Sequence, residues 1–516
     1  MNRSIGRGLC AILVVGAAVT ATTQDRASAP PLDLFFAALS PDDRVARTAL
    51  DTLATQWRDS YTPMIIDMAR LLRPAPRAVA QAAGRGAGAE IAGGGPPGAP
   101  DENSEFDSRG LDAELSAGGT GPVPRESLLR ARLISFLEKQ TGKRFDLYLR
   151  GWREWMWRLP YEPHPDYARF KGMVYGGGVD IRMQRFFPAG AKSLIRLDEI
   201  DWGGVVVNGI PPLYYPKVLK AADARYLQDG NIVFGIVVNG QARAYPKRVL
   251  AWHEMAIDTL GGVELTVVYC TLCGTVIPYD SVVGGRRRAF GTSGLLYRSN
   301  KLMFDEETMS LWSTLEGKPV VGVLVDSGLQ MTSHAAVTTT WREWRTEHPD
   351  TTVLSVDTGH KRDYGEGAAY RDYFSKDDLY FEVSKTDRRL KNKAEVLVMQ
   401  VKPAVGGEAT PVAIVAEFLK KTQVFHFEVA GRRLLAVTSR QGANRVYALG
   451  QEPVTFASQP AMGQLTDTNG RKWTIGEDHL TLVDGGVRLP RFVAQRAFWF
   501  GWYAQYPETM LLGQTR

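Results

Sequence analysis

The sequence predicts an α+β, β-rich fold in which two duplicated β-rich lobes follow a small α-helical module. Up to about residue 195, apolar residues recur at helical spacing. Beyond that point the chain is built from short apolar runs separated by glycine turns. A tryptophan pattern that ends the first β-rich stretch returns near the C-terminus. With 44% hydrophobic and 23% charged residues in 516 positions, the composition excludes wholesale disorder and a polytopic membrane protein.

Charge and cysteine content narrow the class of protein. The formal net charge is +6, spread without long basic runs, so we expect no nucleic-acid partner. The chain has three cysteines, too few for a framework of disulfides.

The first residues have the pattern of a secretory signal peptide. Arg3 and Arg7 precede an apolar stretch at 9–21, which small residues follow. Cleavage is predicted after Ala21, or alternatively after Ala29, so the signal peptide is 1–21 or 1–29. No later stretch is apolar for long enough to cross a membrane. We therefore expect a secreted or periplasmic protein with no transmembrane span in the mature chain.

Residues 32–73 are predicted to form a helical hairpin, either a HEAT-like repeat unit or a plain pair of helices. Ser40-Pro41-Asp42-Asp43 predicts a helix start with an N-cap, a proline at the first helical position and early acidic residues. The apolar residues that follow at helical spacing are Val45, Ala49, Leu53 and Trp57. A second helix begins at Thr62-Pro63. Such a module is a candidate surface for a protein partner.

Two segments connect this module to the β-rich part. Residues 74–124 are rich in glycine, alanine and proline, which predicts a disordered linker. Residues 125–195 are predicted to be a helical, tryptophan-rich connector with a helix near 126–139. Its tryptophans, Trp152, Trp155 and Trp157, lie at helical spacing and are interpreted as core packing.

The first lobe is predicted at 196–360 and a degenerate second copy at 395–516. Asn239-Gly240 between apolar runs predicts a β-hairpin, Gly261-Gly262 precedes another strand, and a short helix is expected at 245–259. The evidence for duplication is the spacing of matching residues: Trp341, Trp344 and Pro349 against Trp499, Trp502 and Pro507, and Asp305 and Trp312 against Asp467 and Trp473.

The chemistry is predicted at Cys270-Thr-Leu-Cys273-Gly274. A thiol oxidoreductase usually places its first cysteine at a helix N-terminus, but Thr275-Val-Ile-Pro278 follows here and is strand-like. The pattern therefore favours a metal knuckle on a turn between two strands. A closed zinc site needs four ligands, and the mature chain has no further cysteine.

The predicted metal ligands are Cys270, Cys273 and His253. His253 lies on the short helix before the strand that ends at Cys270, and we expect its side chain near the surface. Possible additional ligands or groups behind the ligands are His334, His360 and Asp258. Two sulfurs and an imidazole suit copper as Cu(I), and a second imidazole would suit zinc.

Two alternatives stay open. Cys270 and Cys273 could instead form a reversible dithiol in a periplasmic oxidoreductase. In the third interpretation they form a structural disulfide or inert thiols, and the chain acts through its helical module and tryptophan surfaces as an interaction protein.

The duplication bears on this choice. Aligning Gly262 with Gly431 places Ser439 opposite Cys270 and Thr422 opposite His253. The second copy therefore keeps the tryptophans and lacks the candidate chemistry, which predicts one functional lobe and one structural lobe.

These residues carry a family resemblance. Residues 197–359 resemble domain-of-unknown-function family 3179 in the stretches Ala242-Arg-Ala-Tyr-Pro246, Trp252-His-Glu254, Asp258-Thr-Leu-Gly-Gly262, Tyr269-Cys-Thr-Leu-Cys-Gly-Thr275, Phe290-Gly-Thr-Ser-Gly-Leu-Leu-Tyr297, Leu302-Met303, Ser310-Leu-Trp312 and His348-Pro-Asp-Thr351. Thr271 stands where the family commonly has proline. The resemblance implies the domain and no established activity.

Overall fold

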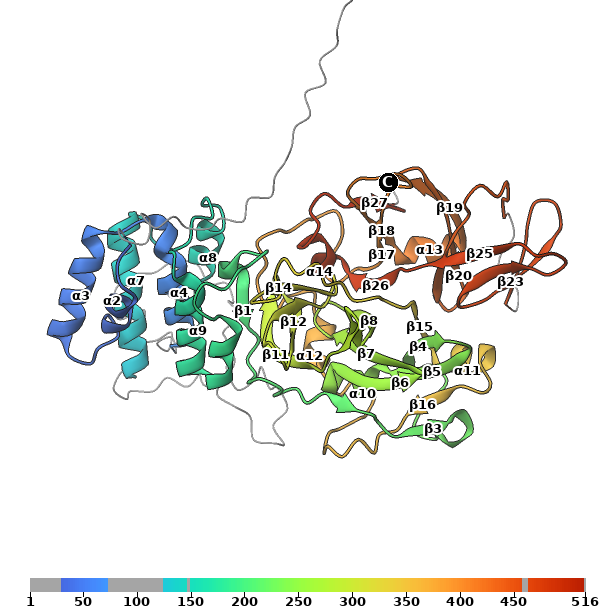
Figure 1. The fold of residues 1–516 in the computed structure, drawn as a ribbon, viewed down its shortest axis with the longest axis horizontal. Coiled ribbons are helices and arrows are strands. Elements are labelled where there is room, and N and C mark those ends of the chain that lie inside the picture. Colours follow the sequence, from blue (N-terminus) through green and yellow to red (C-terminus); the bar gives the residue numbers. More distant parts are fainter. Residues whose placement is uncertain (1–28, 73–123, 146–148, 457–462, 515–516) are drawn as a thin grey trace, which may run out of the picture.

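The computed structural model describes residues 29–72, 124–145, 149–456 and 463–514. The predicted signal peptide and nearly all of the predicted linker lie outside these residues. A group of helices forms the N-terminal end of the described chain, and the rest is mainly strands with a few short helices (Figure 1). The β-rich part of the prediction is confirmed, with several separate sheets.

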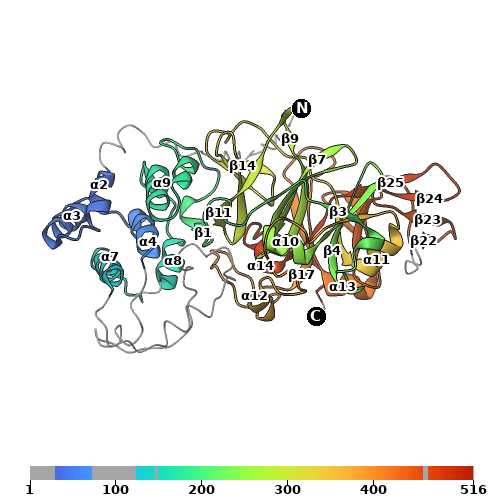
Figure 2. The ribbon, with the colours of Figure 1, turned by 90° about the horizontal axis from the view of Figure 1, so that it is seen from below.

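The helices form one module around a shared apolar core. Leu53, Ile65, Leu133, Trp152 and Phe170 are fully buried together in it. The elements are α2 (Leu32–Ala37), α3 (Asp43–Thr55), η1 (Asp59–Tyr61), α4 (Thr62–Arg70), α7 (Arg125–Thr141), α8 (Arg150–Met156), α9 (Tyr167–Gly178) and η2 (Ile181–Phe186). The helix expected at 126–139 is α7, and Figure 2 shows the same grouping from below. The HEAT-like interpretation stays a prediction.

The start of α3 differs from the expectation. The N-cap is Asp42, whose carboxylate accepts hydrogen bonds from the backbone N–H groups of Arg44 and Val45, so Pro41 lies before the helix. Val45 is 42% exposed. The buried face of α3 consists of Ala46, Ala49 and Leu53.

The first β-rich part contains three larger sheets and one small hairpin. Their strand orders are β1-β11-β12-β13-β14, β15-β4-β5-β16-β3, β2-β6-β7-β8 and β10-β9. The elements are η3 (Leu197–Glu199), β1 (Ile200–Trp202), β2 (Leu213–Tyr214), β3 (Val218–Lys220), η4 (Ala221–Asp223), β4 (Ile232–Val238), β5 (Gln241–Pro246), α10 (Lys247–His253), β6 (Met255–Leu260), β7 (Val263–Cys270), β8 (Thr275–Asp280), β9 (Val282–Val283), β10 (Arg286–Arg287), β11 (Phe290–Tyr297), β12 (Asn300–Asp305), β13 (Leu311–Ser313), β14 (Lys318–Val321), β15 (Ala336–Thr340), α11 (Trp341–Glu347) and β16 (Thr352–Leu354).

The second β-rich part follows a segment in which α12 (Arg371–Ser375) is the one helix or strand. Its sheets have the orders β26-β17-β18-β27 and β19-β20-β21-β25-β24-β23-β22. The elements are β17 (Glu395–Val401), β18 (Thr410–Val415), α13 (Ala416–Thr422), β19 (Val424–Val429), β20 (Arg432–Thr438), β21 (Asn444–Ala448), β22 (Gln464–Thr466), β23 (Lys472–Ile475), β24 (His479–Leu482), β25 (Arg488–Phe492), β26 (Gln495–Phe498), α14 (Trp499–Tyr503) and β27 (Met510–Leu512).

The two β-rich parts share an order of elements. Two paired strands, a short helix and three further antiparallel strands occur as β4-β5-α10-β6-β7-β8 and as β17-β18-α13-β19-β20-β21. The residue after each short helix, Glu254 or Gln423, has a positive φ of 55° or 61°. Its carbonyl accepts a backbone hydrogen bond from Tyr269 in the first part and from Thr438 in the second.

The predicted hairpins are present, and the predicted helix at 245–259 is shorter than expected. Asn239-Gly240 joins β4 to β5, and Gly261-Gly262 joins β6 to β7, with positive φ at all four residues. The helix is confined to α10, because Glu254 takes a left-handed conformation and the chain continues as β6. The strand brings Asp258 into a sheet instead of a helix end.

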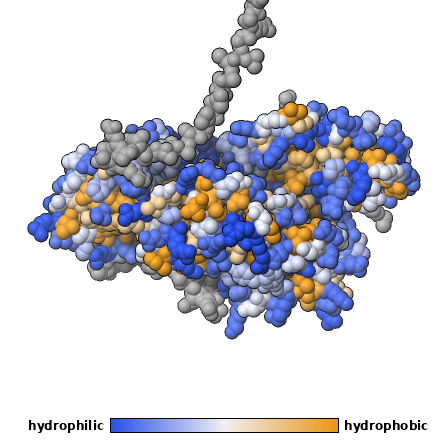
Figure 3. All heavy atoms as spheres, viewed as in Figure 1, coloured by the Kyte–Doolittle hydropathy of each residue, from blue (hydrophilic) through white to orange (hydrophobic). Residues whose placement is uncertain are grey.

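The hydropathy of the surface does not mark out a binding site. On the face of Figure 1, hydrophobic residues lie in small groups among hydrophilic ones, over both the helical module and the β-rich parts (Figure 3). Within the described residues, no helix has both the length and the apolar character that crossing a membrane requires.

Candidate functional site: a buried pair of thiols

Cys270 and Cys273 lie on the turn that joins β7 to β8. Cys270 is paired with Thr275 across the hairpin, and the backbone N–H of Cys273 donates to the carbonyl of Cys270 over 3.1 Å. Gly274 has a φ of +65°, a conformation that side chains other than glycine's rarely adopt. The turn between two strands is therefore as predicted, and it places both sulfurs on one short loop.

Both thiols are free and buried, and their environments differ. The exposed fraction is 5% for Cys270 and 0% for Cys273. The Cys273 thiol donates to the carbonyl oxygen of Ser299 over 3.2 Å. Burial opposes ionisation of Cys270, but hydrogen bonds from the Cys273 thiol and from the backbone N–H groups of Lys301 and Cys273 lower its pKa. Burial and the neighbouring Cys270 raise the pKa of Cys273.

A buried ion pair lies beside Cys270. Lys301 Nζ is 3.3 Å from Glu254 Oε2 and donates to the Glu254 carbonyl over 3.2 Å. The Tyr370 hydroxyl donates to Glu254 Oε1 over 3.1 Å. Both charged side chains are less than 10% exposed, and burial lowers the pKa of Lys301 while Glu254 and Cys270 favour its charged form. Opposite charges thus balance each other in a place that water hardly reaches.

The second β-rich part covers the other side of the cysteine turn. The backbone N–H of Phe498 donates to the carbonyl of Cys273 over 2.7 Å. A Cβ atom added to Gly501 of α14 would lie 3.0 Å from Cys273 Cβ and 3.3 Å from its sulfur. Glycine at this position therefore allows α14 to contact the thiol site directly.

Little open space exists at the thiols themselves. A cavity of about 10 Å³ touches Cys270, Thr275, Asn300 and Thr314, which is room for about one water molecule. Closed in this way, the site admits no substrate.

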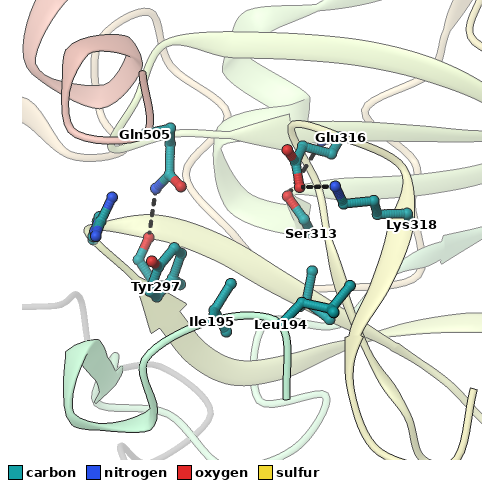
Figure 4. A pocket seen from close by; sticks show the side chains of 9 residues that line it. Leu194, Ile195, Tyr297, Ser313, Glu316, Lys318 and Gln505 are labelled. Carbon is teal, nitrogen blue, oxygen red and sulfur yellow. Dashed lines mark hydrogen bonds and ion pairs between the residues drawn. The ribbon is translucent and has the colours of Figure 1, made fainter. Parts of the chain in front are cut away.

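A larger cavity, of about 160 Å³, lies at the other end of the β11–β12 turn. Arg298 lines this cavity, while the next residue, Ser299, accepts the Cys273 thiol. Figure 4 shows the charged and polar groups there already engaged: Gln505 donates to the Tyr297 carbonyl over 3.1 Å, and Lys318 pairs with Glu316 at 3.2 Å. Gln505, Lys318 and Glu316 thus bind other groups of the cavity wall.

The hydrogen bonds of His253 are made to groups other than the two sulfurs. It is fully buried, contrary to the expected position near the surface, because α10 packs its last turn against the loop at 358–364. Nδ1 lies 2.9 Å from the Pro211 carbonyl and Nε2 lies 2.6 Å from the Tyr364 hydroxyl. Both ring nitrogens are thus engaged by groups other than the cysteines.

Of the three further candidates, His334 and Asp258 have other partners, and His360 lies beside His253. His334 Nε2 lies 2.6 Å from Asp280 Oδ1. The ring of His360 lies 5.2 Å from the ring of His253. Asp258 accepts from Arg243 over 2.6 Å and from Tyr245 over 2.7 Å.

Among the described residues, one group of three His, Cys, Asp or Glu side chains has its possible metal-ligand atoms within 4.8 Å of one another. This group contains neither cysteine. Its members are Glu347, His348 and Glu477. Arg445 pairs with both carboxylates of this group at 2.6 Å, which makes it an ion-pair network between the two β-rich parts. The predicted set of two sulfurs and one imidazole does not converge in this structure.

We expect acid to destabilise the fold through His253. Burial lowers its pKa to about 4, whereas the unfolded chain titrates near its ordinary value of about 6.5. Between these values the unfolded state binds more protons, so stability is lost as the pH falls from about 6.5 to 4. Between pH 7 and pH 5 the loss is about 2 kcal/mol.

Urea unfolding of wild type and His253→Gln at pH 7, 6 and 5 measures this loss. The variant is expected to be less stable at pH 7 and to show a flatter pH dependence. Parallel pH curves for the two proteins would show that His253 titrates normally in the folded state.

Sequence reasoning missed Glu254, Lys301, Tyr370 and Ser299. Glu254 directly follows His253 in the stretch Trp252-His-Glu254, so its place in the sequence could have marked it as a candidate. Lys301 and Ser299 come from a hairpin about thirty positions later, and nothing local marks them as neighbours of the cysteines.

The comparisons with known proteins show the predicted family, with a match that extends beyond the predicted residues 197–359. No curated protein and no solved structure matches the chain significantly. A family model described as "Protein of unknown function (DUF3179)" matches residues 207–509, which include the thiol site and both β-rich parts. The chain therefore belongs to the DUF3179 family.

Proposed function

We propose that Cys270 and Cys273 form a dithiol that exchanges two electrons with the disulfide of a partner protein. The placement of two free thiols on one tight turn between β7 and β8 carries this proposal. Cys270 favours the thiolate, the form that attacks a disulfide. Cys273 retains its one proton, which it donates either to the Ser299 carbonyl or to the ionised Cys270 sulfur. One sulfur is thus suited to attack and the other to resolve the mixed disulfide.

The chemistry balances with a disulfide as the co-reactant. The Cys270 thiolate attacks one sulfur of the partner's disulfide, the S–S bond of the partner breaks, and its second sulfur leaves as a thiolate. Cys273 then loses its proton and attacks Cys270, which releases the partner's first sulfur. The chain loses two electrons and the partner's disulfide becomes two thiols.

The buried ion pair supports this proposal. A thiolate in an apolar place needs a nearby cation or hydrogen-bond donors. Hydrogen bonds from Cys273 and from the backbone N–H of Lys301 favour the Cys270 thiolate, whereas the Glu254 carboxylate opposes it. Cys270 in turn favours the charged form of Lys301, which pairs with Glu254, and Tyr370 holds Glu254 in place. In a thiol oxidoreductase a helix N-terminus usually stabilises the thiolate. Here the strand β8 follows Cys273, and this environment stabilises the thiolate instead.

Binding of Cu(I) by the two sulfurs is the second candidate. Two soft donors sit on one loop, and soft thiolates select Cu(I). Zinc is less favoured, because a closed zinc site takes four ligands and His253 has both nitrogens engaged elsewhere. Release of two thiol protons and uptake of one Cu(I) would leave a complex with one negative charge.

A redox titration tests the first candidate against the second. The full chain is equilibrated in dithiothreitol buffers of graded redox potential and then alkylated. Mass spectrometry of the peptide with Cys270 and Cys273 gives the number of alkylated thiols. We expect one reversible transition that protects both cysteines, and none in Cys270→Ser or Cys273→Ser. Anaerobic titration with Cu(I) in the presence of a chelator serves as the parallel measurement.

Each outcome is decisive. Absence of a Cys270–Cys273 disulfide at every potential, in a folded protein, would refute dithiol exchange. Uptake of one Cu(I) per chain in that case would establish the metal candidate instead.

We also infer that the two β-rich parts are copies of one lobe, of which the first is functional. The shared order of elements and the left-handed Glu254 and Gln423 support this. At matching positions of the two copies, the carboxylate of Glu254 corresponds to the amide of Gln423, and Cys270 corresponds to Ser439. The predicted signal peptide would take the chain to an oxidising compartment, where disulfide-bearing partners are common.

A further inference from the structure

The thiols are covered by a segment of the chain between the two β-rich parts, and that segment is also tied to the helical module. We call residues 370–383 the strap. It contains α12, which Figure 2 shows on the outside of the molecule near α10 and α14. Phe374 of α12 lies against α10 and the end of β26: Lys247 Nζ of α10 lies 4.1 Å from its ring, and the ring of Phe498 in β26 lies 6.2 Å away.

The strap is packed directly on the thiol site. Tyr373, Phe381 and Val383 are buried in one apolar cluster with Cys270 and Cys273. The Tyr373 hydroxyl donates to the carbonyl of Leu272, inside the cysteine turn, over 2.7 Å. The Tyr370 hydroxyl donates to Glu254, as described above. Two tyrosines thus fasten the strap to the turn and to the ion pair beside Cys270.

Glu382 ties the same segment to the helical module. It lies between two strap residues that are buried at the thiols, Phe381 and Val383. Its carboxylate is 3.3 Å from Arg153 and 3.7 Å from Arg150, both on α8. Arg153 is held in turn by Asp201. One of the contacts that hold the strap is therefore made with a part of the chain outside the family match.

We propose that the strap is a cover that must open before a partner reaches Cys270, and that the pairing of Glu382 with Arg153 keeps it closed. This inference rests on the proposed function for its purpose, since a partner's disulfide cannot enter a cavity of about 10 Å³. The strap has a single five-residue helix and no strand, so it can move without breaking a sheet. Elements with few backbone hydrogen bonds open locally at lower cost than sheet strands.

The rate at which a small thiol reagent reacts with the native protein measures this opening. N-ethylmaleimide is added to the reduced full chain, and alkylation of the peptide that contains Cys270 and Cys273 is followed by mass spectrometry, because the full chain also contains Cys10. Glu382→Gln removes the charge that pairs with α8, while Arg153 keeps Asp201. Tyr373→Phe removes the bond to Leu272. We expect alkylation to be about 3- to 10-fold faster in each variant, and faster still in the double variant.

Glu417→Gln is the matched control. Glu417 also pairs with a cation, Lys421, at 2.9 Å, but on the exposed surface of α13. Its alkylation rate is expected to equal that of wild type. Hydrogen exchange of the amides at 370–383 is measured in the same proteins and is expected to quicken in Glu382→Gln and not in Glu417→Gln.

The outcomes separate this inference from the proposed function. Unchanged alkylation in both strap variants, with the fold intact, would overturn the cover. So would an increase that merely follows the denaturant midpoint of each variant, because that would report global unfolding. Faster alkylation in a protein that forms no Cys270–Cys273 disulfide would support the cover and refute dithiol exchange.

Discussion

Replacing Asp201 by alanine is expected to lower the free energy of unfolding by about 3–5 kcal/mol. Asp201 lies on β1 with 6% of its side chain exposed, and it pairs with Arg70 of α4 and Arg153 of α8. The variant leaves both arginines short of a partner in a place where each side chain is at most 11% exposed. Removing one member of a buried ion pair is costly because the remaining charge stays out of water.

Asp326→Ala is the control for this measurement. Asp326 pairs with Lys192 at 3.0 Å, but the two side chains are 50% and 59% exposed. An exposed pair contributes less than about 1 kcal/mol. Urea unfolding of the two variants gives the comparison. Equal midpoints would show that Asp201 does not hold the helical module to the first β-rich part.

Local features of the fold could be predicted from the sequence. Asn239-Gly240 and Gly261-Gly262 both form tight hairpins, because these residues accept positive φ at little cost. The turn at Cys270–Cys273 was predicted for the same kind of reason: Gly274 and a strand-like sequence follow it. In each case the deciding residues lie within a few positions of one another.

The surroundings of the thiols could not be predicted, because they come from distant parts of the chain. Lys301, Tyr370 and Gly501 each approach from a different element. His253 shows the opposite error. Its closeness in sequence to the cysteines suggested a shared site, but the left-handed Glu254 that ends α10 brings its own carboxylate to the ion pair, while His253 bonds to Pro211 and Tyr364.

The second large effect is expected at Trp473, and it tests whether the second lobe is structural. Trp473 is 1% exposed, and its indole N–H donates to Asp467 over 3.0 Å. It packs in an apolar cluster that contains neither cysteine. Trp473→Ala is expected to cost about 3–5 kcal/mol of stability, a large share of a typical domain's roughly 5–15 kcal/mol.

The folded fraction of Trp473→Ala should still form the Cys270–Cys273 disulfide at the potential of wild type. Trp473 suits this test better than Trp502, because α14 carries Trp502 and contacts Cys273 through Gly501. Ser439→Ala, at the place opposite Cys270, should leave the redox potential unchanged and lower the melting temperature only slightly, through loss of the hydrogen bond from the Ala443 N–H. Because stability and potential are measured on the same samples, a shifted potential in either variant would mean that the second lobe takes part in the chemistry.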